Sequence, residues 1–351
     1  MSKLHNLFKI MHMREETEAE LPVLLIYGID PLWTPSERAE VDRESRRLGF
    51  AMRRQGHSVS LLPVMDEDLR GVLSPYKPRD VLVFNCCEGL PGINRSDALV
   101  AETLEELDFT YTGASAETLQ LSYDKPRVKE ILQSHGVPTP RWSLHKSANV
   151  RGWDLFPAIV KPAWEHCSVG VDAGAVVSDL GELKQRVAYV VDTFEQPALV
   201  EDFIDGPEFH VPIWGNQDVE VLPVVERDFT ALDDMHERLC SYDAKFVPES
   251  EAYQKIRTWV PARLSEEEGQ RLQTAAKGAY EALGCRDYGR IDIRLRDGIF
   301  YVIDVNPNAD ISADASLALA AGKAGYCYGA MGSRVVKLAS ERHPQNLAPH
   351  Q

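Results

Sequence analysis

The sequence predicts an α/β protein built from two or three packed units. The chain has 351 residues, of which 44% are hydrophobic, and this length and composition are typical of a globular protein with a sizeable core. In its first third, apolar runs of strand length alternate with helical stretches. The breaker Pro138-Thr139-Pro140 ends this part, and near the C-terminus Arg296-Asp297-Gly298 is a typical hairpin turn between two strands.

The first unit is expected to run strand, helix, strand, strand, as an open α/β domain does. A helix is predicted over Ser36–Gln55, with Ser36 as its N-cap and Gly56 as its left-handed stop. Residues 1–20 show no clear period and are interpreted as an extension. The strands are predicted from apolar or alternating segments: Leu21–Tyr27, Ser58–Pro63 and Val81–Phe84.

The rest of the chain mixes strands and helices. The later helices are expected at Asp97–Leu107, Tyr123–His135, Asp179–Glu195, Ser265–Leu283 and Ala313–Ala339. The later strands are expected at Ala158–Lys161, Ala173–Val177, Ala198–Glu201, Phe209–Trp214, Val219–Val225, Tyr288–Leu295 and Ile299–Val305. A long polar loop, Asp228–Tyr253, is interpreted as functional. We therefore expect, after the extension, an N-terminal α/β domain over 21–120, a central unit over 121–212 and a C-terminal unit over 213–351.

Charge and cysteine pattern exclude several classes of partner. The formal net charge of -16 repels phosphate backbones and anionic lipid, which argues against nucleic-acid or membrane partners. No apolar run is long enough to span a membrane, and the first 20 residues do not resemble a secretory signal. The six cysteines lack zinc-type spacing, and the adjacent Cys86 and Cys87 lack the gap of a redox pair. A cytoplasmic protein that acts on small molecules is expected.

Polar residues of the predicted hairpin form the strongest chemical signal. Arg290 and Asp292 lie two residues apart on one strand, as do Asp304 and Asn306 on the next, so each pair projects from one face. The hairpin brings both pairs side by side, where two carboxylates and an amide oxygen suit Mg²⁺. Arg290 can stabilise charge on a transferring phosphoryl or acyl oxygen. The alternative is a solvated hairpin face with surface ion pairs.

An ordered series of motifs resembles the ATP-grasp enzymes, specifically the D-alanine–D-alanine ligase group. The similarity covers roughly residues 21–339, and seven patterns in the family's order are not readily accidental. The motifs are Phe84-Asn85 with Glu88–Gly92, Tyr111-Thr112-Gly113, Asp124-Lys125 and Lys129 with Gly136–Pro140, Lys161-Pro162 with Ser168-Val169-Gly170, Glu201 with Gly206–Phe209, Tyr242–Lys245, and Tyr288–Asp292 with Asp304-Val305-Asn306.

The resemblance implies an ATP-grasp fold with ATP and Mg²⁺ as cofactors, two metal ions being expected and Mn²⁺ being possible. Its implied metal ligands are Asp292, Asp304 and Asn306. The implied nucleotide contacts are Lys125, Lys161, Ser168 and Val169 at the phosphates, Glu201, Phe203 and Ile204 at the adenine, and Glu208 at the ribose. The less favoured alternatives for these residues are ordinary surface lysines and glutamates paired with a nearby Lys or Arg. The phosphate loop is poor in glycine, because His166 and Cys167 stand where the family has small residues.

The implied reaction is the ATP-dependent joining of a carboxylate donor to an amine acceptor through an acyl phosphate. Arg290 would hold charge in both steps, Lys245 would reach the γ-phosphate, and Glu40 would grip the ammonium of the first substrate. A solvated loop lysine and a helix-surface acid are the alternatives for the last two. By resemblance we expect a homodimer.

The chain departs from the family at the loop that binds the second substrate. Asp310 stands in the turn that offers backbone N–H groups, and the family's serine falls on Ala315, with Ser316 one residue away. With Asp314, Asp310 would favour a cationic or hydroxylated acceptor, a hypothesis that exposure of both side chains to solvent would contradict. Asp304 replaces the family's usual glutamate, a change that metal binding should survive.

Several functions stay open at this stage. Genuine D-alanine–D-alanine ligation is one, and synthesis of another dipeptide or amide is at least as plausible. A binding protein that retains nucleotide without ligating is the alternative from another class. A dinucleotide-dependent oxidoreductase is disfavoured, because Gly28 is followed by Ile29-Asp30-Pro31 and not by a Gly-x-Gly-x-x-Gly pattern. Sequence does not identify the donor, the acceptor or their stereochemistry.

Overall fold

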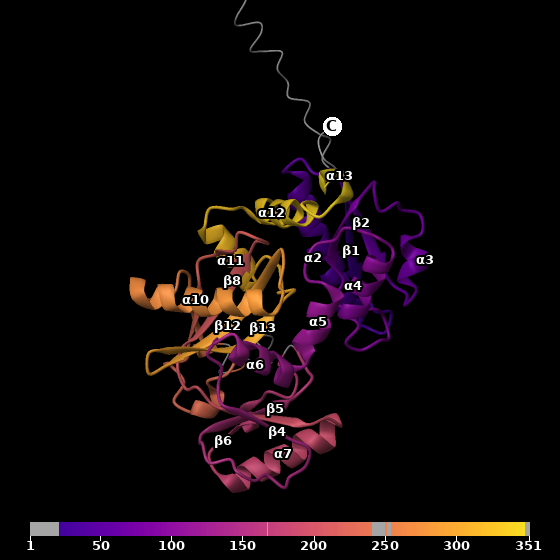
Figure 1. Cartoon of the computed structure of the whole chain (residues 1–351). Helices are drawn as coiled ribbons and strands as arrows, with labels where there is room; N and C mark the ends of the chain where they lie inside the picture. The colour runs from indigo at the N-terminus through magenta and orange to yellow at the C-terminus, as the bar shows by residue number, and fades with distance from the viewer. Residues whose placement is uncertain (1–20, 167, 241–249, 251–253, 348–351) are drawn as a thin grey trace, which may run out of the picture.

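The computed structural model describes residues 21–166, 168–240, 250 and 254–347. Three sheets divide this part of the chain, and each lies in a separate unit of the molecule (Figure 1). The N-terminal sheet lies beside the C-terminal one, and the central sheet lies below both in this view. The predicted α/β class is confirmed. None of the helices within these residues is long and apolar enough to cross a membrane.

The first sheet belongs to the open α/β unit that the sequence predicts, and its strands are parallel. Its middle strand β1 (Val23–Gly28) pairs in parallel with β2 (Val59–Val64) and with β3 (Leu82–Cys86). Successive side chains of a strand point to opposite faces, so β1 supplies two different cores, with Val23, Leu25 and Tyr27 on one face and Leu24 and Ile26 on the other. Both faces of this sheet are therefore covered.

The helices around this sheet differ from the expected ones at their starts. Helix α2 (Pro35–Arg53) is capped by Thr34 and not by Ser36: Thr34 Oγ1 accepts from the Glu37 N–H, and the Glu37 carboxylate accepts from the Thr34 N–H at 2.8 Å. Pro35 explains the shift, because proline suits the first helical position, where its missing N–H leaves no bond unmade. Gly56 has a φ of 105°, as expected for a left-handed stop.

The segment before the second sheet holds more helices than the sequence predicted. Helix α4 (Asp97–Glu106) lies where it was expected. The predicted helix over Tyr123–His135 starts two residues later as α6 (Lys125–Ser134), because the Asp124 side chain caps it by accepting from the Arg127 N–H. Two short helices were not predicted: α3 (Leu69–Leu73) and α5 (Ala116–Tyr123).

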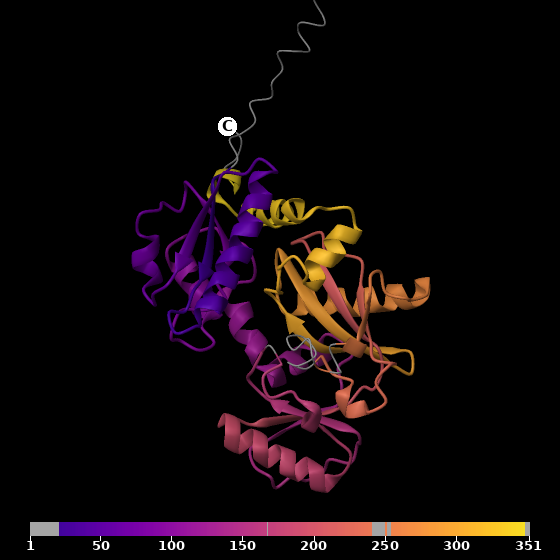
Figure 2. The same cartoon turned by 180° about the vertical axis from the view of Figure 1, so that it is seen from behind.

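The C-terminal helices complete the core of the first domain. The single helix expected over Ala313–Ala339 is split into α11 (Ser316–Lys323) and α12 (Tyr328–Ser340), with Gly325 at a φ of 95° between them. Helix α12 lies along α2, where a Cβ atom on Gly329 would come within 2.3 Å of the Ala51 carbonyl oxygen (Figures 1 and 2). The end of the expected C-terminal unit therefore packs on the N-terminal domain.

The central sheet is small and antiparallel. Its strands follow the order β4 (Trp142–His145), β7 (Ala198–Asp202), β5 (Ala158–Pro162), β6 (Val176–Val177). Helix α7 (Leu180–Phe194) packs its apolar residues against this sheet, as the sequence predicted for this segment. The strand expected over Ala173–Val177 is mostly a 3₁₀ turn, Ala173–Ala175, that ends in β6.

The third sheet carries two different faces. Its strands are β11 (Arg257–Trp259), β10 (Val225–Asp228), β8 (Glu208–Trp214), β12 (Tyr288–Arg296) and β13 (Ile299–Asn306), with β9 (Glu220–Val221) paired to β8. The strand expected over Val219–Val225 is thus two strands, and the boundary expected at 212 falls inside β8. One face packs on α10 (Glu266–Ala282) through residues such as Phe209, Ile291 and Ile293. The other face carries the polar residues of the strands.

Candidate nucleotide and metal site

Two carboxylates face each other across the β12–β13 hairpin. Arg290 is in register with Asn306, and Asp292 is in register with Asp304. Arg290 donates two hydrogen bonds to the Asp292 carboxylate, at 2.7 and 2.9 Å, and Asn306 Nδ2 donates to Asp292 Oδ2 at 3.1 Å. The structure therefore places the four residues of the predicted metal site together on one patch.

Asp304 forms an ion pair with a lysine. Lys125 Nζ, at the first residue of α6, lies 3.1 Å from Asp304 Oδ1. Burial opposes ionisation of Asp304, but the charges of Lys125, His166 and Lys161 hold its pKa well below the usual range. The Asp304 and Asp292 carboxylates and the Asn306 amide oxygen are hard donors at one sheet end, so the residues present fit a Mg²⁺ ion.

A buried carboxylate joins two lysines next to this patch. Glu201 is 1% exposed and lies 3.1 Å from both Lys129 Nζ and Lys161 Nζ. Burial lowers the pKa of Lys129 to about 8, although Glu201 opposes this shift. Glu201, expected at the adenine edge, is thus an ion-pair partner here, which was its alternative interpretation. Lys129 belongs to one of the family-like motifs but was given no role from the sequence, although its position four residues after Lys125 places both on one helix face.

An arginine fills the slot expected for the adenine base. The Arg294 guanidinium is 3% exposed and lies 5.1 Å from the centre of the Phe203 ring and 4.9 Å from that of the Phe229 ring. Phe203 and Ile204 are the residues expected to hold the base. The guanidinium donates to three acceptors: Glu208 Oε2 at 2.9 Å, Ile204 O at 3.1 Å and Arg238 O at 2.6 Å. Sequence analysis did not assign Arg294 a role, although it follows Arg290 and Asp292 on the same strand face.

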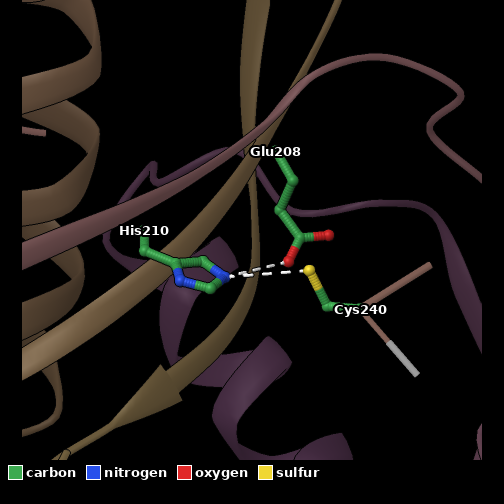
Figure 3. A group of neighbouring side chains, drawn as sticks. All are labelled: Glu208, His210 and Cys240. Carbon is green, nitrogen blue, oxygen red and sulfur yellow. Dashed lines mark hydrogen bonds and ion pairs between the residues drawn. The ribbon is translucent and has the colours of Figure 1, made fainter. Parts of the chain in front are cut away.

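Glu208 is part of a second group of side chains on β8. Its Oε1 lies 3.3 Å from His210 Nε2, and Cys240 Sγ lies 4.0 Å from the same nitrogen (Figure 3). Burial alone would raise the pKa of Glu208, but the charge of Arg294 and hydrogen bonds from His210 and Cys240 hold it well below its usual value. His210 Nδ1 lies 2.8 Å from Ser316 Oγ, so this buried serine, a candidate for the second substrate, is bonded inside the protein.

Contacts of Ser168 and His166 hold the loop expected over the phosphates. Ser168 has a φ of 61°, and its hydroxyl donates to the Cys240 carbonyl oxygen at 3.0 Å, while Val169 is exposed. His166 Nε2 lies 3.1 Å from Ser122 Oγ, and its ring packs edge-on against Tyr123. Burial lowers the pKa of His166 to about 4. Cys167, Tyr242 and Lys245 lie outside the described residues.

The residues expected to bind substrates have few contacts. Glu40 is exposed on α2 and pairs with Arg43 at 3.5 Å, as a helix-surface acid does. Asp310 is exposed and accepts hydrogen bonds from the Ser312 N–H and hydroxyl, and Asp314 is also exposed. This exposure argues against the hypothesis that both aspartates attract a cationic acceptor.

Comparison with known proteins agrees with the fold. The three sheets, with the polar face of the third toward the central unit, define an ATP-grasp protein. Residues 131–337 match a family model described as "D-ala D-ala ligase C-terminus". The chain belongs to the D-alanine–D-alanine ligase-like family of ATP-grasp proteins, which confirms the resemblance inferred from its motifs.

Individual relatives extend along most of the chain. An uncharacterized protein of Sinorhizobium fredii, y4sG, is 34% identical over 84% of this chain and 86% of its own length. A D-alanine–D-alanine ligase of Marinomonas is 28% identical over 94% of this chain and 99% of its own. The crystal structure of D-alanine–D-alanine ligase from Bacillus anthracis complexed with ATP has a TM-score of 0.71 at 20% identity, covering 93% of this chain and 99% of that one, which shows the same fold.

Proposed function

We propose that this protein is an ATP-dependent carboxylate–amine ligase that forms an amide bond through an acyl phosphate. The observation that carries the proposal is the register of the hairpin, which sets Asp292 against Asp304 and Arg290 against Asn306. Surface charges do not ordinarily place two carboxylates in direct opposition, because like charges there repel. A site that binds Mg²⁺ and nucleotide phosphates gives this arrangement a function.

The residues of the site have separate tasks in this proposal. Asp292, Asp304 and Asn306 would hold Mg²⁺, which supplies positive charge to the phosphate oxygens when it is bound. Lys125 and Lys161 donate to phosphate oxygens, after giving up their present carboxylate partners. Arg290 stabilises negative charge that develops when the donor carboxylate attacks the γ-phosphate and when the amine displaces phosphate.

We further propose that the acceptor differs from D-alanine. The hydroxyl of Ser316 is bonded to His210 inside the protein and Ala315 has no hydroxyl, so neither residue offers an O–H to an acceptor carboxylate. The neighbouring turn is tied down as well, because the Asn308 side chain accepts from the Ala114 N–H at 2.8 Å. These contacts favour an acceptor recognised by other groups.

Phosphate release from Mg-ATP tests both the proposed ligase activity and the proposed difference in acceptor. The protein would be offered a panel of single and paired L- and D-amino acids, and the products would be identified by mass spectrometry. Release that requires a particular pair supports the ligase and identifies its substrates, whereas D-Ala-D-Ala from D-alanine alone would contradict the altered acceptor. ATP binding by calorimetry without phosphate release for any donor and acceptor would contradict ligation.

The second candidate function is nucleotide binding without turnover. It is raised by one observation: Arg294 lies over the rings of Phe203 and Phe229 and bonds the carboxylate expected at the ribose, so a nucleotide that leaves this arginine in place would bind away from the position expected for ligation. A nucleotide has to displace this guanidinium before it can bind in the expected way. The calorimetric arm of the same experiment separates the two functions.

A further inference from the structure

Three side chains with different donor atoms converge beside the hairpin patch. Glu208, His210 and Cys240 each offer one ligand atom, and these atoms all lie within 4.8 Å of one another (Figure 3). Glu208 and His210 come from β8 and are 4% and 3% exposed, and Cys240 comes from the loop after β10. We propose that these residues form a binding site for a thiophilic divalent metal ion such as Zn²⁺, distinct from the Mg²⁺ site.

The distances are close to those that a tetrahedral ion requires. Zinc bonds of about 2.0 Å to oxygen and nitrogen and about 2.3 Å to sulfur place O and N about 3.3 Å apart and N and S about 3.6 Å apart. In the structure, Glu208 Oε1 and His210 Nε2 are 3.3 Å apart, and Cys240 Sγ is 4.0 Å from the same nitrogen. A small movement of Cys240 toward His210 completes the three-ligand set, and water takes the fourth position.

The outer partners of two ligands are already in place. His210 Nδ1 lies 2.8 Å from Ser316 Oγ, and Glu208 Oε2 accepts from Arg294 at 2.9 Å. Metal-binding histidines and carboxylates are usually oriented in this way by a hydrogen bond to their other polar atom. His210 and Glu208 therefore each have one polar atom fixed by the protein and the other directed at the cluster.

Two hydrogen bonds to Glu208 keep the three side chains together when no metal is bound. Cys240 and His210 both bond to the Glu208 carboxylate, which requires an S–H and an Nε2–H donor. A divalent ion would replace both: the thiol loses its proton to solvent, and the ring proton moves to Nδ1, where Ser316 Oγ accepts it. Binding therefore releases one proton from the protein.

The ligand atoms of this site favour a different metal ion from the one that the hairpin patch favours. Sulfur and imidazole nitrogen select zinc and similar transition metals, whereas carboxylate and amide oxygens select Mg²⁺. His210 is in register with Asp292, so the two sites are neighbours on adjacent strands but share no ligand. Excess Mg²⁺ should therefore occupy the hairpin patch and leave the cysteine-containing site to the softer ion.

If the protein binds ATP as proposed above, a metal ion at this site should compete with the nucleotide. Glu208 is the residue expected at the ribose, and a metal-bound carboxylate is not available to it. Ser168 donates to the Cys240 carbonyl oxygen, so an ion on Cys240 would also fix the phosphate loop relative to β8. We expect Zn²⁺ and ATP to exclude each other.

Cobalt absorption of the full-length chain tests the site directly. Co²⁺ is titrated in excess Mg²⁺, and a thiolate-to-cobalt charge-transfer band reports sulfur ligation, which the all-oxygen hairpin site does not give. We expect the band to saturate at one equivalent and to vanish on addition of Zn²⁺. Cys240→Ser should abolish the band, whereas Cys327→Ser, which removes an exposed cysteine at the N-cap of α12, should leave it unchanged.

Further variants and a competition arm complete the test. His210→Gln should weaken Co²⁺ binding at least about 10-fold, and its thermal unfolding shows whether it is folded. Absence of the band in the wild type, or its retention in Cys240→Ser, would overturn the proposal. ATP is then added to the cobalt-loaded protein: loss of the band supports exclusion, while a band that persists with ATP bound leaves the metal site standing and removes only the link to the nucleotide.

Discussion

The guanidinium of Arg294 donates a hydrogen bond to Glu208 Oε2 across 2.9 Å, deep in the space between the central and C-terminal sheets. Both groups are almost fully buried, so each neutralises a charge that would otherwise be costly there. Phe203 and Phe229 stack on the same guanidinium. A ligand that uses Glu208 or this slot has to exchange with Arg294.

Removing the arginine should therefore ease nucleotide binding. Arg294→Met keeps much of the apolar volume and frees the slot, and we expect the ATP dissociation constant to fall about 10-fold, because a charge-assisted bond of about 1.5–3 kcal/mol no longer has to be broken. Calorimetry with a non-hydrolysable ATP analogue measures this. Arg271→Met, which changes an exposed arginine of α10 that donates to the Gly298 carbonyl oxygen, is the matched control and should change affinity little. Weaker binding by Arg294→Met would identify the arginine as a nucleotide ligand.

The opposed carboxylates should be essential for turnover. Asp304→Asn removes the negative charge in register with Asp292, and we expect kcat for phosphate release to fall at least about 100-fold, since transition-state charge loses its counter-charge. Calorimetric titration with Mg²⁺ in the presence of nucleotide gives a second readout, which should weaken in parallel. Asp192→Asn, on the exposed side of α7, is the control with an equivalent change. Turnover that survives Asp304→Asn would remove this hairpin from the mechanism.

Acid should weaken the packing of the phosphate loop through His166. Its pKa is about 4 in the folded protein, below the usual value of about 6.5, so the unfolded chain binds more protons between these values. Stability therefore rises with pH from about 4 to 6.5 and is lost as pH falls through this window. His166→Gln should show a smaller drop in Tm between pH 7.5 and pH 5 than the wild type.

Other groups titrate in the same window, so the comparison requires a control histidine. His135→Gln alters an exposed side chain at the end of α6 and should follow the wild-type profile. Coincident profiles for His166→Gln and the wild type would show that the ring does not carry this pH dependence.

A buried ion pair should hold the first domain to the end of the chain. Asp287 is 0% exposed and accepts from two Arg342 nitrogens, at 2.6 and 2.8 Å, and from the Gly113 N–H at 2.8 Å. Arg342→Ala leaves the carboxylate with little compensation, and we expect a loss of about 2–4 kcal/mol, seen as a clear fall in Tm. Arg43→Ala, in an exposed pair with Glu40, should cost less than about 1 kcal/mol. Equal Tm values for the two variants would contradict this role of Asp287.

Local pattern predicted the elements that carry the hairpin patch. The Asp-Gly turn fixed the pairing of its two strands, and the two-residue spacing of Arg290 and Asp292 fixed their face, so the position of these residues beside Asp304 and Asn306 follows from the sequence alone. Boundaries were less accurate where capping chemistry competes, as at Thr34. The break between α11 and α12 was missed because alanine-rich segments favour helix on both sides of Gly325.

The sequence by itself determined the family, the order of the three units and the hairpin patch, because these depend on residues that are near one another along the chain. Tertiary structure alone decided the partners of the buried charges: Glu201 with two lysines, Glu208 with Arg294, and Cys240 beside His210. Those contacts join segments up to 86 residues apart, and no local periodicity encodes them. Each buried charge pairs with whichever counter-charge the packed sheets bring within reach, which only the assembled fold determines.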